Sequence, residues 1–232
     1  NMSLGNIGLA FVEPISGGDI QYYHDAIKID SWQSWLSSFN ANQESLLCHA
    51  RTHPPGAVLI QKLFFTISQS ALWISIVFLF LSSISIVLIY KIFINLGKDK
   101  LFSNKMAFLY AVIPSVNIYS LSTLDAIIAM LTNIVILAVI IVLECKERKR
   151  MIAWGVFSAM SITLASLLTF GSVYLWAVVG TFSIYLFYFY NNKKILILFS
   201  GSLVLFLLII VFLDQAYGYD YIESFFTASR LE

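Results

Sequence analysis

The chain has 232 residues, of which 59% are hydrophobic and only 12% are charged. Soluble domains typically carry about 25% charged residues, and a soluble fold could not hide this much apolar surface. The composition therefore excludes a soluble globular protein and indicates an all-α, polytopic transmembrane helix bundle. The two cysteines, Cys48 and Cys145, show neither metal-ligand spacing nor a disulfide framework.

Residues 1–56 form the only long stretch that is polar enough to lie in water. The glycines at 17–18 predict a turn that leads into a helix over 19–25. Apolar residues with the 3–4 spacing of a short helix follow at Trp32, Trp35, Leu36 and Phe39. This helix either lies on the membrane surface, with its tryptophans at the level of the headgroups, or packs on protein.

The stretch from Arg51 to Gly56 separates this polar segment from the apolar remainder. Two consecutive prolines, Pro54 and Pro55, restrict φ to about −65° and push the residues before them into extended geometry. The sequence therefore predicts a rigid elbow that holds Arg51 and His53 where a loop meets the membrane. Proline is also favoured in the first turn of a helix, so a plain helix start is the alternative.

Six membrane-spanning helices are predicted after the elbow, because crossing about 30 Å of hydrocarbon takes about 20 apolar residues. A short helix over 57–66 either lies at the interface or continues into the first span. Only Pro114 falls inside a span, and neighbouring helices can absorb that break. We thus divide the chain into a loop segment (1–56), a bundle (57–213) and a tail (214–232). The predicted spans cover residues 70–90, 103–121, 124–143, 152–170, 173–190 and 195–213.

The distribution of Lys and Arg predicts the orientation. Ten of the 14 lie in or beside the first, third and fifth loops between spans, and the two alternating loops hold none. Since basic loops stay in the cytoplasm, residues 1–66 and 214–232 are expected on the outer face of a cell membrane. The tail mixes aromatic and acidic residues, which fits an interfacial belt or packing against the first outer loop. The chain starts at Asn1 and no closing element follows the tail, so we expect truncation at both ends.

Ionisable residues are absent from the middle of every predicted span, which argues against a secondary transporter. Acidic residues gather instead at the outer edge, in the first loop and at Asp125, which opens the 124–143 span. Carboxylates there, beside Arg51 and His53, suit a reaction between a lipid-borne substrate and a water-side acceptor. The sequence has no phosphate-binding glycine loop, no nucleophile elbow and no feature of nucleic-acid binding.

These motifs together resemble the GT-C superfamily of membrane glycosyltransferases, in the branch of the dolichyl-phosphate-mannose–protein mannosyltransferases and the lipid A aminoarabinose transferases. Those enzymes usually have an Asp-Glu pair where this chain has Asp19-Ile20, so the family aspartate is either Asp19 or Asp25. The family also has one span before its acidic loop and more after the seventh, so the resemblance covers about helices two to seven. It is carried by Asp19-x-x-x-Tyr23, the surface helices, Pro54-Pro55, Pro114, and Asp125 in Leu121-Ser122-Thr123-Leu124-Asp125.

The resemblance implies a donor sugar linked through phosphate to a polyprenol, and an acceptor (lipid, glycan or protein) on the outer face. A polyprenyl phosphate is already a good leaving group, so one carboxylate that deprotonates the acceptor suffices for an inverting displacement. We assign that base to Asp19, with Asp25 as the alternative. Positive groups stabilise the departing phosphate, and this role is assigned to Arg51, with His53 or Lys28 assisting.

Asp125 is assigned as a second acidic site. His49 and His53 are four residues apart, which would put both rings on one helical face and suit a divalent metal. The prolines that follow disfavour a helix there, so no metal or other cofactor is assigned. The rival function is a non-catalytic membrane protein, such as half of a transporter or flippase. The expected partners are the donor, the acceptor and membrane lipids, without nucleic acid.

Overall fold

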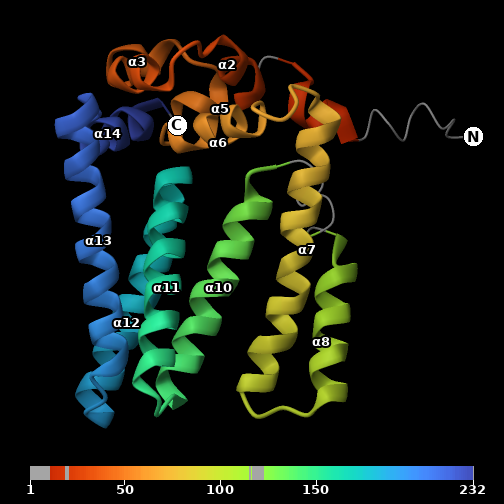
Figure 1. Cartoon of the computed structure of the whole chain (residues 1–232), viewed down its shortest axis with the longest axis vertical. Coiled ribbons are helices and arrows are strands. Elements are labelled where there is room, and N and C mark those ends of the chain that lie inside the picture. Colours follow the sequence, from red (N-terminus) through yellow and green to blue (C-terminus); the bar gives the residue numbers. More distant parts are fainter. Residues whose placement is uncertain (1–10, 19–20, 115, 117–122, 232) are drawn as a thin grey trace, which may run out of the picture.

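The computed structural model describes residues 11–18, 21–114, 116 and 123–231. These residues form helices and no β-strand, which confirms the all-α prediction. Long helices run side by side along the bundle, and short helices cover one of its ends (Figure 1).

Five described helical segments are long and apolar enough to cross a membrane, as a multi-pass membrane protein requires. In hydrocarbon a backbone polar group finds no water, so a crossing segment must pair its own N–H and C=O groups within a helix. Five of the predicted spans match these segments to within a few residues at each end. The segments are α7 (Ala71–Asn95), α10 (Asp125–Glu144), α11 (Arg148–Leu168), η2 (Phe170–Ser172) with α12 (Val173–Tyr190), and α13 (Lys194–Tyr217).

The second predicted span is only partly described, as the 13-residue helix α8 (Lys100–Val112). We expected this helix to continue through Pro114, but it ends two residues earlier, and Ile113 is extended. A proline ring clashes with helical geometry in the residue before it, which accounts for the early end. The remainder of this predicted span includes residues 115 and 117–121, which lie outside the described residues.

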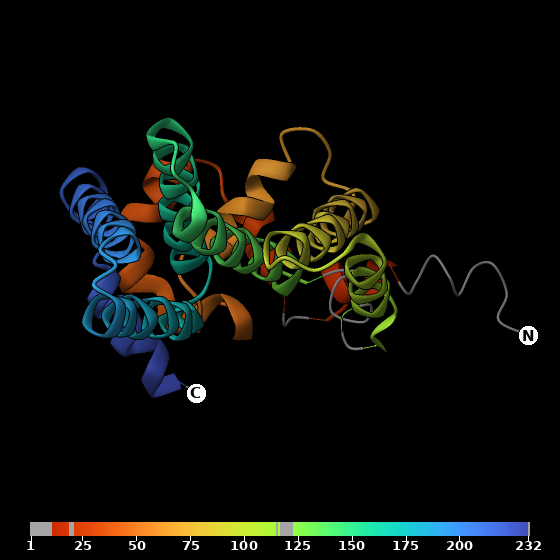
Figure 2. The same cartoon turned by 90° about the horizontal axis from the view of Figure 1, so that it is seen from below.

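Seen along the bundle, the long helices form a curved row rather than a closed ring (Figure 2). α8 lies at one end of the row, beside α7, which packs against α10. α10 packs against α11, and α12 and α13 complete the other end. A buried apolar cluster from α10 to α13, which includes Val135, Ile162, Leu175 and Ile195, holds that end together.

The cap is the set of short helices that covers one end of the bundle. It forms two parts, one from the N-terminal segment and one from the tail. The predicted helix around Trp32–Phe39 is confirmed, although it divides at Ser38, and its Leu36 and Phe39 are packed against Tyr219 of the tail. The helix predicted over 19–25 begins at Tyr22, and residues 19–20 lie outside the described residues. The cap comprises α2 (Tyr22–Lys28), α3 (Trp32–Ser37), α4 (Phe39–Asn42), η1 (Gln43–Ser45), α5 (Cys48–Arg51), α6 (Gly56–Phe64) and α14 (Tyr221–Leu231).

Apolar side chains dock the N-terminal part of the cap onto the long helices. Ala26 and Val58 are fully buried in one cluster with Phe78 of α7 and Ile127 of α10. Fully burying a valine side chain such as that of Val58 typically contributes about 1.5–3 kcal/mol. α6 belongs to the cap and ends at Phe64, so it is not continuous with α7.

The tail packs against the N-terminal segment, as one of its two predicted placements requires. Gly218 ends α13 with a φ of 70°, a left-handed conformation that glycine adopts without a steric penalty. The chain then turns, and Tyr219 is fully buried with Phe39. Asn40 donates to the carbonyl oxygen of Asp220 at 2.8 Å and accepts from its amide at 3.1 Å.

The basic loops lie at the opposite end of the bundle from the cap (Figure 1). We call this the basic end, and it carries residues 145–150 and 191–194. Lys194 joins the two loops of the basic end, because the Lys194 ammonium donates to the carbonyl oxygens of Leu143 at 3.0 Å and Cys145 at 2.8 Å. As predicted, the described parts of the loop segment and the tail lie at one end of the bundle, and the basic loops lie at the other (Figure 1).

A close backbone contact fixes the cap against α11. Gly56, the first residue of α6, faces the carbonyl oxygen of Leu167, and a Cβ at position 56 would clash with it. Only glycine allows this approach.

Gly56→Ala is therefore expected to lower the thermal unfolding midpoint of the protein in detergent, by a destabilisation of about 1–3 kcal/mol from overpacking. Gly201→Ala is the matched control, since among the described residues no atom outside the local helix backbone lies within 4 Å of a Cβ there. That variant should keep or raise the midpoint, because alanine is the better helix former. Equal midpoints for the two variants would contradict the proposed contact.

Candidate functional site

The predicted elbow connects α5 to α6 within the cap. α5 ends at Arg51, both Pro54 and Pro55 are buried, and α6 begins at Gly56. The two proline carbonyl oxygens accept hydrogen bonds from the amides of residues 57 and 58, each at 3.1 Å. The elbow therefore starts a helix as well as turning the chain, so the two sequence interpretations are compatible.

Three aromatic rings meet beside the elbow. The ring centroid of Tyr22 lies 5.9 Å from that of His49 and 5.5 Å from that of His53. Nδ1 of His53 lies 3.0 Å from the carbonyl oxygen of His49. Oγ1 of Thr52 lies 3.3 Å from the same nitrogen, and the two contacts together fix the orientation of the ring. The elbow thus presents an imidazole of fixed orientation next to a phenol.

Asp125 belongs to the same region, although it comes from a different part of the chain. Tyr22 is only 5% exposed. Burial raises the pKa of its phenol well above the ordinary value, and the negative charge of Asp125 raises it further. Tyr22 therefore remains a hydrogen-bond donor at neutral pH. Asp125 itself is exposed at the first residue of α10, where its carboxylate also interacts favourably with the helix dipole.

Asp25, the alternative base, is buried, and both of its carboxylate oxygens interact with other residues. One carboxylate oxygen accepts from the amide of Leu47 at 3.1 Å, which fixes the residue that precedes α5. The other lies 3.5 Å from the ammonium of Lys28, whose side chain is 69% exposed. Asp25 thus joins α2 to α5, and Lys28 is its partner on the cap surface.

Arg51, the predicted phosphate ligand, is half-buried at the end of α5. Its Nε is buried and has no hydrogen-bond partner among the residues that the structure describes. The backbone of Arg51 is held by Gln43, whose side-chain amide donates to the carbonyl oxygen of Arg51 at 2.9 Å. The same amide donates to the carbonyl oxygen of Ser224 in α14 at 3.0 Å. Gln43 is fully buried. Its two hydrogen bonds connect the elbow directly to α14.

The acidic motif is split at the boundary of the described region. Asp19, the predicted base, lies outside the described residues, so its role remains a prediction. Tyr23 of the same motif donates to the carbonyl oxygen of Gln69 at 2.6 Å, and its ring packs against Phe65. Tyr23 thus holds the connection between α6 and α7, whereas its neighbour Tyr22 contacts the elbow.

The histidine pair considered for a metal is close but incomplete. The ring centroids of His49 and His53 are 6.3 Å apart. Among the residues that the structure describes, no group of three or more His, Cys, Asp or Glu side chains is arranged to hold a metal ion. Zinc sites in proteins normally use at least three protein ligands, so the pair alone does not define one.

The described part of the site therefore contains a protonated phenol, two imidazoles, a carboxylate and a guanidinium at the edge of the apolar bundle. Such groups can bind an anion and can accept a proton. The sequence located the elbow and Asp125, but it did not identify Tyr22 or Gln43 as parts of this region. The sequence contained a weak indication for Tyr22, since it lies within the Asp19-x-x-x-Tyr23 motif. Gln43 had none, because nothing in the sequence distinguishes a buried glutamine from an exposed one.

Asp25→Ala is expected to destabilise the protein by about 1–3 kcal/mol, because the Leu47 amide loses its acceptor inside the cap. Asp25→Asn keeps an oxygen in place and should cost much less. Thermal unfolding of both variants in detergent tests this difference. A midpoint for Asp25→Ala equal to that of the wild type would show that Asp25 does not hold α5.

Comparison of the chain with protein-family models, with curated proteins and with solved structures finds no significant match.

Proposed function

We propose that this chain is part of a membrane glycosyltransferase, which moves a sugar from a polyprenyl-phosphate donor to an acceptor at the cap end. The observation that carries the proposal is the grouping of His53, Tyr22 and Asp125 at one end of an apolar bundle, with Arg51 two residues before His53. A lipid-linked donor would reach such a site from the membrane, and a polar acceptor would reach it from water.

The charge distribution supports a placement of the cap on the outer face. The basic end carries residues 145–150 and 191–194, and such loops are retained in the cytoplasm. The cap lies at the other end of the bundle (Figure 1). The reaction would accordingly use a donor whose sugar has already been moved to the outer side.

The proposed reaction is one inverting displacement. Asp19 takes the proton of the acceptor hydroxyl, and the acceptor oxygen forms a bond to the anomeric carbon of the sugar. The bond from that carbon to the phosphate oxygen breaks, and the polyprenyl phosphate leaves with the electron pair. Arg51 stabilises the charge on this phosphate, assisted by His53 or Lys28. Asp125 is the second carboxylate of the region, and its proximity to Tyr22 supports a role in orienting the acceptor.

Asp19→Asn should reduce sugar transfer by about 10²–10⁴-fold while donor binding persists, because an amide keeps the shape but cannot accept a proton. The assay follows transfer from a labelled polyprenyl-phosphate sugar in membranes, with donor binding measured separately. Asp25→Asn is the control and should remain active, since its oxygens serve the cap.

An inactive Asp25→Asn together with an active Asp19→Asn would keep the mechanism but reassign the base. Full activity of both variants would instead favour a non-catalytic protein, such as half of a transporter or flippase.

Arg51→Lys should weaken donor binding without unfolding the protein, because lysine keeps the charge but loses the planar group that binds phosphate oxygens in pairs. Arg230→Lys, at an exposed position of α14, is the matched control and should bind donor normally. Equal donor affinity in Arg51→Lys and the wild type would remove Arg51 from the site.

A further inference from the structure

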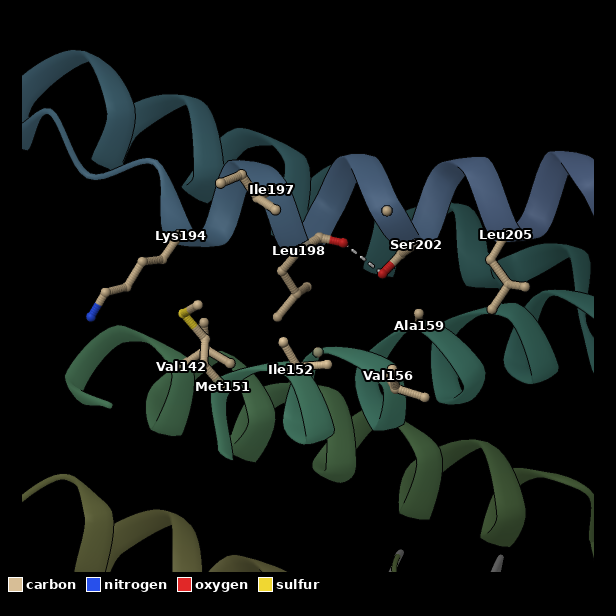
Figure 3. A pocket seen from close by; sticks show the side chains of 12 residues that line it. Val142, Met151, Ile152, Val156, Ala159, Lys194, Ile197, Leu198, Ser202 and Leu205 are labelled. Carbon is tan, nitrogen blue, oxygen red and sulfur yellow. Dashed lines mark hydrogen bonds between the residues drawn. The ribbon is translucent and has the colours of Figure 1, made fainter. Parts of the chain in front are cut away.

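A groove runs between α11 and α13 towards the basic end of the bundle (Figure 3). Its volume is about 450 Å³, within the range of about 300–1,000 Å³ that is typical of ligand sites. Apart from Lys194 and Ser202, every lining residue is apolar or glycine. Ser202 donates its hydroxyl to the carbonyl oxygen of Leu198 in its own helix, so it adds no recognition group.

The groove results from small residues on two facing helices. Gly155 of α11 and Gly201 of α13 both line it, and in the described part of the chain no atom outside the local helix backbone lies within 4 Å of a Cβ built at either position. The floor is buried, as Leu198 is 7% exposed, whereas Ile152 and Ile197 on the rims are 53% and 69% exposed. A long, narrow apolar chain would therefore fit between the rims.

Lys194 lies at one end of the groove, and Figure 3 shows Leu205 at the other. The Lys194 ammonium donates two hydrogen bonds, to the carbonyl oxygens of Leu143 and Cys145. A lysine ammonium has three N–H donors, so one remains for a further acceptor. The two carbonyl contacts also hold the positive charge in place at the groove end.

The surroundings of Lys194 are strongly basic. Residues 144–150 and 191–194 contain six Lys or Arg and two Glu. Lys193 is exposed in the same loop but does not line the groove. A negative headgroup at this end would therefore meet one fixed ammonium within a wider positive field.

We infer that this groove binds one acyl chain of an anionic phospholipid, with the lipid phosphate at Lys194. The inference combines an almost wholly apolar groove, open to the side of a membrane-spanning bundle, with a positive charge fixed at its end. The site is separate from the cap, so it is independent of the proposed transfer reaction.

Native mass spectrometry of the full chain in detergent tests the site, with phosphatidylglycerol and phosphatidylcholine of identical acyl chains as probes. The wild type should bind phosphatidylglycerol more tightly. Lys194→Gln should weaken this binding by about fivefold, the effect of one basic residue near a lipid headgroup, and Lys194→Arg should preserve it. Lys193→Gln is the matched control and should bind like the wild type.

Filling the groove tests the acyl chain. Gly155→Leu and Gly201→Leu should each weaken binding by about tenfold or more, because several methylene groups lose their contact. Ser200→Leu adds the same side chain at an exposed neighbouring position outside the groove, and it should bind normally.

Three results would overturn the assignment. Wild-type affinity in both glycine variants would show that the lipid binds elsewhere. An equal loss in Lys193→Gln and Lys194→Gln would reduce the effect to diffuse attraction by the basic end. Equal affinity of the wild type for the two lipids would leave only nonspecific solvation by hydrocarbon chains.

Discussion

The structure depends on one constraint, which is that hydrocarbon offers no hydrogen-bond partner to a backbone. Each long apolar segment must therefore be helical, and side chains that carry charge are confined to the ends of the bundle. The two ends differ in kind. One carries basic loops, and the other carries a cap of short helices with acidic, aromatic and imidazole groups. Any chemistry at a membrane edge must use one of these ends, and the cap is the end with both carboxylates and proton-accepting rings.

The cap can serve as a site only if it is held firmly on the bundle. Apolar burial of Ala26 and Val58 and the close approach of Gly56 to α11 provide that support. The tail adds a second anchor, since Gln43 hydrogen-bonds at once to the elbow and to α14. Asp25 links α2 to α5. These contacts fix the elbow from several sides, so the position of Arg51 depends on residues distant in sequence.

The sequence predicted the helical class and five crossing segments because long apolar runs have few alternatives in a membrane. It also predicted the elbow and the first residue of α10, since proline and a charged residue mark such boundaries. It did not foresee that the second predicted span stops being helical after Val112, two residues before Pro114, and it left the placement of the tail open. Contacts such as Tyr22 with His53, or Gln43 with Ser224, depend on tertiary packing, which no local pattern reports. The groove beside Lys194 was missed for the same reason.

The central claim is that the cap and the basic loops face opposite sides of the membrane, with the cap outside. Native Cys48, studied in a Cys145→Ser variant, allows a direct test because it is exposed in the cap. A membrane-impermeant maleimide should label Cys48 in intact cells. A cysteine introduced by Lys149→Cys in a cysteine-free background should react only after permeabilisation. Labelling of the Lys149→Cys variant in intact cells, with Cys48 protected until permeabilisation, would contradict the account.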